Sequence, residues 1–167
     1  MKSIIFIALY AFVCTSQSTE VPNSMVGQHQ LSLEEAERIL GEPAILKERT
    51  SDNQTDIYSS KSTFMAKAID PKTQKQGNVY YMIEHYKNTE EATKVIQSFI
   101  KSNQNHKGFE LLTGYGDEAF FQTDKDNFCL IIIRKDNKMI RIKVNRVTSK
   151  TSFDALRSIG KDLTTRI

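Results

Sequence analysis

The chain has 167 residues and a formal net charge of +3 at pH 7, from 23 basic and 20 acidic side chains. Because the acids are interspersed among the lysines, the charge pattern argues against a nucleic-acid-binding protein. The two cysteines, one of them inside an apolar N-terminal run, exclude a fold held together by internal disulfides.

The first 18 residues, MKSIIFIALYAFVCTSQS, have the pattern of a secretory signal peptide. Lys2 supplies the positive charge, an apolar run follows over residues 4–13, and Ser16-Gln17-Ser18 offers a cleavage site between small residues. The run is too short to span a membrane, which requires about 20 apolar residues. We therefore predict an exported protein, periplasmic or secreted.

Cys14 lies at the end of the apolar run, where a bacterial lipoprotein carries its lipidated cysteine. Val13 departs from the small residue that usually precedes this cysteine, so two outcomes stay open. Cleavage after Ser18 leaves a soluble protein, whereas acylation of Cys14 tethers the protein to a membrane. Residues 19–30 lack hydrophobic periodicity and are predicted to form a linker to a single domain over residues 31–167.

The domain opens with a helix in LSLEEAERILG, where Ser32 and Glu35 have the spacing of a capping box and Gly41 provides a stop. Three strand-like segments follow at residues 44–50, 56–69 and 78–86, and we read them as an antiparallel meander.

A second helix is predicted from an Asn88 cap, because apolar residues recur on one helical face: Ala92, Val95, Ile96, Phe99 and Ile100. FELLTGYG and GDEAFFQT are predicted strands. The segment NFCLIIIRKDNKMIRIKVNRV is a predicted hairpin with its turn at Asp136-Asn137, which places Ile133 opposite Ile140. A last helix is predicted over residues 152–167. The order α-βββ-α-ββββ-α predicts an α+β domain, with an antiparallel sheet of about six strands and helices packed on it.

Two stretches, LSLEEAERILGEP and GYGDEAFF, resemble segments of small bacterial envelope lipoproteins. Those proteins resemble the PsbP-like α/β/α sandwich, in which an antiparallel sheet lies between helices. The resemblance implies an envelope location and a sandwich fold for most of residues 31–167. It brings no catalytic residues to this chain.

The GYGDEAFF stretch raises the question of a phosphate-binding or catalytic loop. A phosphate loop places its glycines before a helix, whereas Ala119 and the phenylalanines after it favour a strand, so we interpret the glycines as turn residues. If the strand has already begun at Asp117, Asp117 and Glu118 point to opposite sides of it and cannot both line one cleft. Together with His85 they are the candidates for an alternative hypothesis, a hydrolase with a site assembled from dispersed residues. Cys129 is expected to be a buried hydrophobe rather than a nucleophile.

No metal site or cofactor is predicted, because His29, His85 and His106 lack neighbouring ligands at metal-binding spacing. Asn53-Gln54-Thr55 is a glycosylation sequon in a predicted polar loop, and it matters only in a eukaryotic secretory pathway.

The candidate binding residues are three tyrosines and two cations. Aromatic rings with a polar tip suit interfaces, and a basic stripe suits an acidic partner or a lipid headgroup. Core packing for the tyrosines and a solvated sheet edge for the basic stripe remain the alternatives. We predict a non-enzymatic envelope protein that binds a protein partner or a small ligand through residues of this set: Tyr80, Tyr86, Tyr115, Arg141 and Lys143.

Overall fold

The computed structural model describes residues 30–167. The predicted signal peptide, Cys14, His29 and nearly all of the predicted linker lie outside the described residues. The elements follow in the order α1 (Leu33–Leu40), β1 (Ala44–Asn53), β2 (Ile57–Ala66), β3 (Asn78–Tyr86), α2 (Thr89–Asn103), β4 (Phe109–Leu112), β5 (Glu118–Thr123), β6 (Cys129–Lys135), β7 (Lys138–Val144) and α3 (Phe153–Leu163).

All strands join one antiparallel sheet of seven strands in the spatial order β1-β2-β3-β7-β6-β5-β4. The predicted α+β class with an antiparallel sheet is confirmed. The predicted count of about six strands was too low: FELLTGYG and GDEAFFQT both contribute to the sheet, as β4 and β5, although β4 is a short edge strand of four residues.

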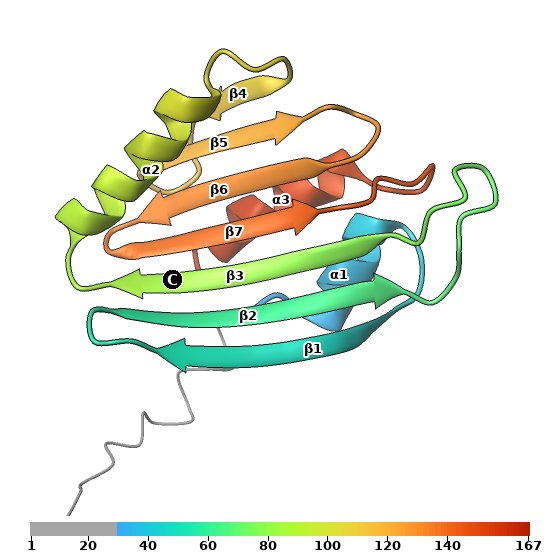
Figure 1. Cartoon of the computed structure of the whole chain (residues 1–167), viewed down its shortest axis with the longest axis horizontal. Coiled ribbons are helices and arrows are strands. Elements are labelled where there is room, and N and C mark those ends of the chain that lie inside the picture. The colour runs from blue at the N-terminus through green and yellow to red at the C-terminus, as the bar shows by residue number, and fades with distance from the viewer. Residues whose placement is uncertain (1–29) are drawn as a thin grey trace, which may run out of the picture.

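Helix α2 lies on one face of the sheet, and helices α1 and α3 lie on the other (Figure 1). The larger core lies between the sheet and the α1/α3 pair, and a smaller core lies under α2. No helix in residues 30–167 is long and apolar enough to cross a membrane.

Local sequence explains where the helices begin. Ser32 and Glu35 form the predicted capping box: the Glu35 N–H donates to Ser32 Oγ over 3.1 Å, and the Ser32 N–H donates to Glu35 Oε2 over 2.8 Å. Asn88 Oδ1 accepts from the Glu91 N–H over 2.9 Å and so starts α2. The third helix ends at Leu163, earlier than predicted.

The β6–β7 hairpin has the predicted register. Ile133 pairs with Ile140, Ile131 with Ile142, and Cys129 with Val144, and these side chains are fully buried in the α1/α3 core. The alternate residues of β7 face the α2 side. This register therefore decides which side chains of β7 reach the surface described below.

The loop between β2 and β3 is held by Asp70, which is buried. Its carboxylate accepts from the Ser149 N–H over 2.8 Å, from Ser149 Oγ over 3.0 Å and from Thr73 Oγ1 over 2.7 Å. The bond from the Ser149 backbone N–H outweighs the cost of burial, so the pKa of Asp70 lies well below its ordinary value. This carboxylate ties the loop to the segment that precedes α3.

Strand β1 is one edge of the sheet, and nearly all of its residues are exposed. Its pairing with β2 shifts register between Leu46 and Glu48, which marks a β-bulge. The Asn53 sequon lies at the end of this strand and not wholly in a loop as predicted, because β1 continues three residues past the predicted segment.

Candidate functional site

The α2 side of the sheet is covered over only part of its area. Helix α2 packs on β5, β6 and on the neighbouring ends of β3 and β7, and no other described helix lies on this side (Figure 1). The remaining surface is here called the open face. Its side chains are partly exposed and come from four neighbouring strands: Lys61, Thr63 and Met65 of β2, Tyr80 and Met82 of β3, Leu130 of β6, and Arg141 and Lys143 of β7.

Strand register arranges the open face in two rows across the sheet. In one row Lys61 pairs with Met82, and Met82 pairs with Arg141. In the next row Thr63, Tyr80, Lys143 and Leu130 lie opposite one another in turn. Because neighbouring strands are about 4.8 Å apart, each cation is one strand away from a Met82 or Tyr80 side chain.

Arg141 links the open face to α2. One guanidinium nitrogen, Nη2, donates to Glu84 Oε2 over 2.6 Å, and the guanidinium carbon lies 4.7 Å from the centre of the Phe99 ring. Its Nε has no hydrogen-bond partner among the described residues, although it is buried. The guanidinium is therefore held by the Glu84 hydrogen bond and by the Phe99 ring against one of its faces, while Nε donates no hydrogen bond to a described residue.

Lys143 has an aromatic contact but no acid beside it. Its Nζ lies 5.8 Å from the centre of the Phe128 ring, and within residues 30–167 no carboxylate forms an ion pair with it or with Lys61. Glu84, two residues after Met82 on β3, is already bound to Arg141. The centre of the open face is therefore positive.

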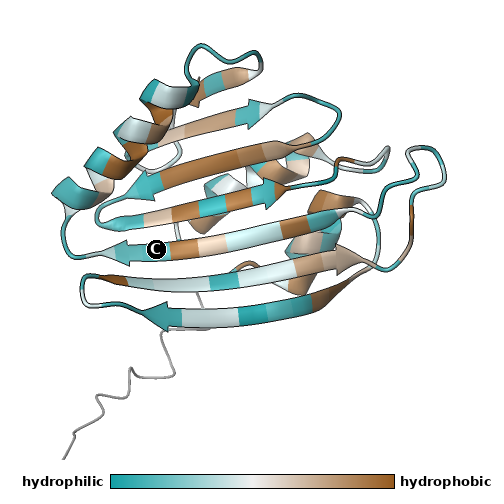
Figure 2. Cartoon of the chain, in the orientation of Figure 1, coloured by the Kyte–Doolittle hydropathy of each residue, from teal (hydrophilic) through white to brown (hydrophobic). Residues whose placement is uncertain are grey.

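The open face also has apolar surface. The Tyr80 hydroxyl donates to Met82 Sδ over 3.1 Å, so the two side chains lie against each other. Partial burial raises the pKa of Tyr80, even though the nearby Arg141 charge lowers it, and the phenol stays neutral at ordinary pH. In Figure 2 the ribbon of β6 is apolar over most of its length, whereas β2, which lies beyond β7 and β3, is more polar.

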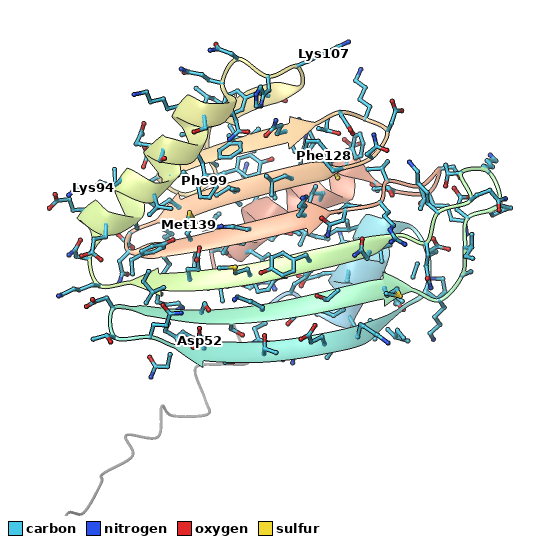
Figure 3. All side chains as sticks on the ribbon, viewed as in Figure 1. Asp52, Lys94, Phe99, Lys107, Phe128 and Met139 are labelled. Carbon is cyan, nitrogen blue, oxygen red and sulfur yellow. The ribbon has the colours of Figure 1, made fainter. Side chains whose placement is uncertain are left out.

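A groove of about 510 Å³ runs along one flank of α2. Its side chains share one helical face: Lys94, Val95, Ser98, Phe99, Ser102 and Asn103. Since Phe99 also contacts Arg141, the groove adjoins the open face (Figure 3). The groove and the open face together form a shallow surface with an apolar base and cationic side chains.

The structure brings three of the five predicted binding residues, Tyr80, Arg141 and Lys143, onto this surface. Tyr86 lies elsewhere: it is 5% exposed in the core under α2, its hydroxyl donates to Glu84 over 3.1 Å, and burial together with the Glu84 charge raises its pKa to about 12. Tyr115 lies in the β4–β5 connection and packs against the α1/α3 core on the other side of the sheet.

The residues considered for a hydrolase do not meet. Strands β7 and β6 separate His85 on β3 from Glu118 on β5, and the pairing register puts the two side chains on opposite faces of the sheet. The His85 ring lies edge-on to Tyr58, with 5.6 Å between the ring centres. No group of three or more His, Cys, Asp or Glu side chains within the described range has a metal-binding arrangement.

The GYGDEAFF stretch is a turn that leads into β5, and its acids serve one buried arginine. Arg134 Nε donates to Glu118 Oε2 over 2.6 Å, and Arg134 Nη1 donates to Asp117 Oδ2 over 2.8 Å. The condition under which the two acids would point apart is not met, because β5 begins only at Glu118 and Asp117 still belongs to the turn. We call this arrangement the arginine clasp.

Cys129 is fully buried, as predicted, and burial raises the pKa of its thiol to about 12. A thiol held in its neutral form in the core is a packing group and not a nucleophile.

No protein-family model matches this chain, and no curated protein matches its sequence. What the open face can bind is therefore inferred from its own geometry.

Sequence reasoning missed Met82, Glu84 and Phe99 as parts of this surface. Strand alternation along β3 places Met82 and Glu84 on the same side of the sheet as Tyr80. These two residues could therefore have been predicted from the sequence. Phe99 was assigned only to the inward face of its helix, and no sequence pattern predicted its contact with β7.

Proposed function

We propose that this protein is an exported, non-enzymatic binding module of the cell envelope, which holds a partner or a small ligand on the open face. The observation that carries the proposal is the positive centre of that face, where Arg141 and Lys143 adjoin partly exposed apolar side chains. A surface that combines cations with aromatic and thioether groups is suited to recognition. The pattern of the first 18 residues and the resemblance to envelope lipoproteins support the location.

The separation of His85 from Asp117 and Glu118 favours a binding role over the hydrolase hypothesis, which depends on these residues. Catalysis by a histidine and a carboxylate needs both groups within hydrogen-bond reach of the same substrate. Here the acids of the GYGDEAFF stretch are bound to Arg134, on the other side of the sheet from His85.

Site-specific photocrosslinking in the cells that produce the protein tests the role of the open face. A photoreactive phenylalanine at Tyr80 is expected to give a discrete crosslinked product, whereas the same group at Lys161, exposed on α3, serves as the matched control. Equal product from both positions, or none from Tyr80, would count against binding through the open face.

Mass spectrometry of the native N-terminus tests the location. Cleavage after Ser18 yields an unmodified chain that begins at Thr19, whereas lipidation yields a chain that begins at an acylated Cys14. An intact Met1 in the native protein would contradict export by a cleaved signal peptide.

A further inference from the structure

The chemistry of the open face also narrows the class of ligand. Resting on the proposed binding function, we propose that the ligand is a small amphiphilic anion, with one carboxylate or phosphate headgroup at Arg141 and Lys143 and an apolar part along the groove beside α2. Three independent features of the surface support this class of ligand.

The first feature is the charge at the centre of the face. Lys143 has no carboxylate partner in the described part of the chain, and Arg141 has one, Glu84, at 2.6 Å. Lys61 adds a third cation on the far side of Met82. The acids of β1 on this side, Glu48 and Asp52, lie on the edge strand and pair with Thr63 and Ser59 of β2. An anion is therefore attracted to the β3–β7 part of the face and not to the edge.

The second feature is the unused capacity of Arg141. A buried N–H without a partner is unfavourable, and the Nε of Arg141 is in that position. A planar guanidinium binds a carboxylate or phosphate with two parallel N–H groups, a geometry that a single bond to Glu84 does not use. A headgroup that reaches this edge of Arg141 would give Nε the partner that it lacks among the described residues.

The third feature is the apolar surface that begins at the same place. Phe99 covers one flat side of the Arg141 guanidinium and also lines the groove along α2, where Val95 lies one helical turn before it. Leu130 lies between Lys143 and the residues under α2. An alkyl chain or a ring that starts at the headgroup thus meets the apolar side chains of Phe99 and Val95, a contact that inorganic anions do not use.

The size and shape of the surface favour a small molecule over a macromolecule. The groove of about 510 Å³ is within the usual range for small-ligand sites, and it lies on one side of a helix. Docking of a folded protein needs on the order of 800 Å² from each partner. The apolar side chains of the open face are only partly exposed. A flexible alkyl chain can fit between them and cover them more fully than a flat protein surface would.

The test is a titration of the full-length protein with dodecanoate below its micellar concentration, followed by amide NMR shifts and calorimetry. The expected shifts centre on β3 and β7 around Tyr80 and Lys143. Lys143→Gln is expected to weaken binding about tenfold, since a charge-assisted contact is lost. Lys138→Gln is the matched control, because it removes the same charge from the same strand on the other face of the sheet and is expected to leave affinity unchanged.

Three further ligands decide between explanations. Dodecyltrimethylammonium has the same chain with the opposite charge, and equal binding would overturn the role of the cations. Inorganic phosphate tests the headgroup alone, and binding as tight as that of dodecanoate would overturn the role of the groove. Vesicles of anionic phospholipid test a membrane surface, and binding to vesicles without binding of free dodecanoate would overturn the small-molecule assignment.

The outcome is separable from that of the binding proposal itself. If dodecanoate fails to bind while the photoreactive group at Tyr80 still gives a discrete product, the ligand class is wrong and the open face remains a binding surface. If both experiments fail, the proposed function is wrong as well. Arg141→Lys gives a second check, because it keeps the charge and is expected to lose several-fold in affinity with the loss of the planar fork.

Discussion

Replacement of Arg134 by methionine is expected to destabilise the fold strongly. The guanidinium is 8% exposed and forms three bonds: to Glu118 over 2.6 Å, to Asp117 over 2.8 Å and to the Asp136 carbonyl over 2.9 Å. Methionine keeps most of the buried aliphatic volume but leaves two neighbouring carboxylates without their cation.

The magnitude follows from the exposure of each partner. Breaking a fully buried ion pair by removing one member costs about 3–5 kcal/mol. Asp117 is 46% exposed, so water replaces much of that contact, whereas Glu118 is only 20% exposed. We expect a loss of about 3 kcal/mol in the free energy of unfolding, or about 10 °C in Tm for a domain of this size.

Urea unfolding at pH 7 measures this loss. Lys94→Met is the control, since its ion pair with Glu90 is 71% and 76% exposed and is expected to contribute almost nothing. A triple variant that adds Asp117→Asn and Glu118→Gln to Arg134→Met should recover part of the stability, because the unpaired charges are gone. A loss below about 0.5 kcal/mol for Arg134→Met, or no recovery in the triple variant, would refute the reasoning.

Three other outcomes are expected. Gly116→Ala should lower the free energy of unfolding by about 2–3 kcal/mol, because the residue has φ +62° and an added Cβ would lie 2.5 Å from the Arg134 carbonyl oxygen. Gly114→Ala should lower it by only about 1 kcal/mol, because Gly114 has φ +78° but open space around it. Urea unfolding midpoints of the two variants would show whether the losses differ. Cys129 should resist thiol reagents at pH 8 in the native protein and react once the protein is unfolded, since the pKa of its thiol is about 12. Rapid labelling of Cys129 in the native protein, detected by mass spectrometry, would contradict this. Asp70→Ala should lower the urea unfolding midpoint at pH 7. Because folding lowers the pKa of Asp70, the difference in midpoint between variant and wild type should narrow as pH falls below the ordinary pKa of 3.8. A difference that stays constant down to pH 2 would contradict this.

Local pattern was sufficient for most of the fold. The Ser32 capping box, the Asn88 cap and the two-residue β6–β7 turn depend on contacts between residues three or four apart or on strand alternation, which the sequence displays directly. The prediction that Cys129 is buried followed from the same alternation.

The candidate site was only half accessible to such reasoning. Alternation put Arg141 and Lys143 on one side of β7, but the sequence does not specify how far α2 extends across the sheet. That position is set by packing of the helix on Phe120, Ile132 and Met139, which are brought together only in the folded sheet. Tyr86 was misplaced for this reason: the same helix that leaves Tyr80 uncovered buries Tyr86.

The arginine clasp escaped prediction because the turn changes the direction of one side chain. Asp117 precedes β5 and follows the left-handed Gly116, so strand alternation does not apply to it. Its partner is also on another strand, 17 residues further along the chain.

The bulge in β1 has a consequence for molecules at high concentration. An edge ten residues long offers enough unpaired amide and carbonyl groups for a strand of a second molecule to extend the sheet. The shift of register after Leu46 and the exposed charges of Lys47, Glu48 and Arg49 interrupt that edge near its middle. The bulge and these charges oppose edge-to-edge pairing between copies of the chain at high concentration, even though the edge strand is long.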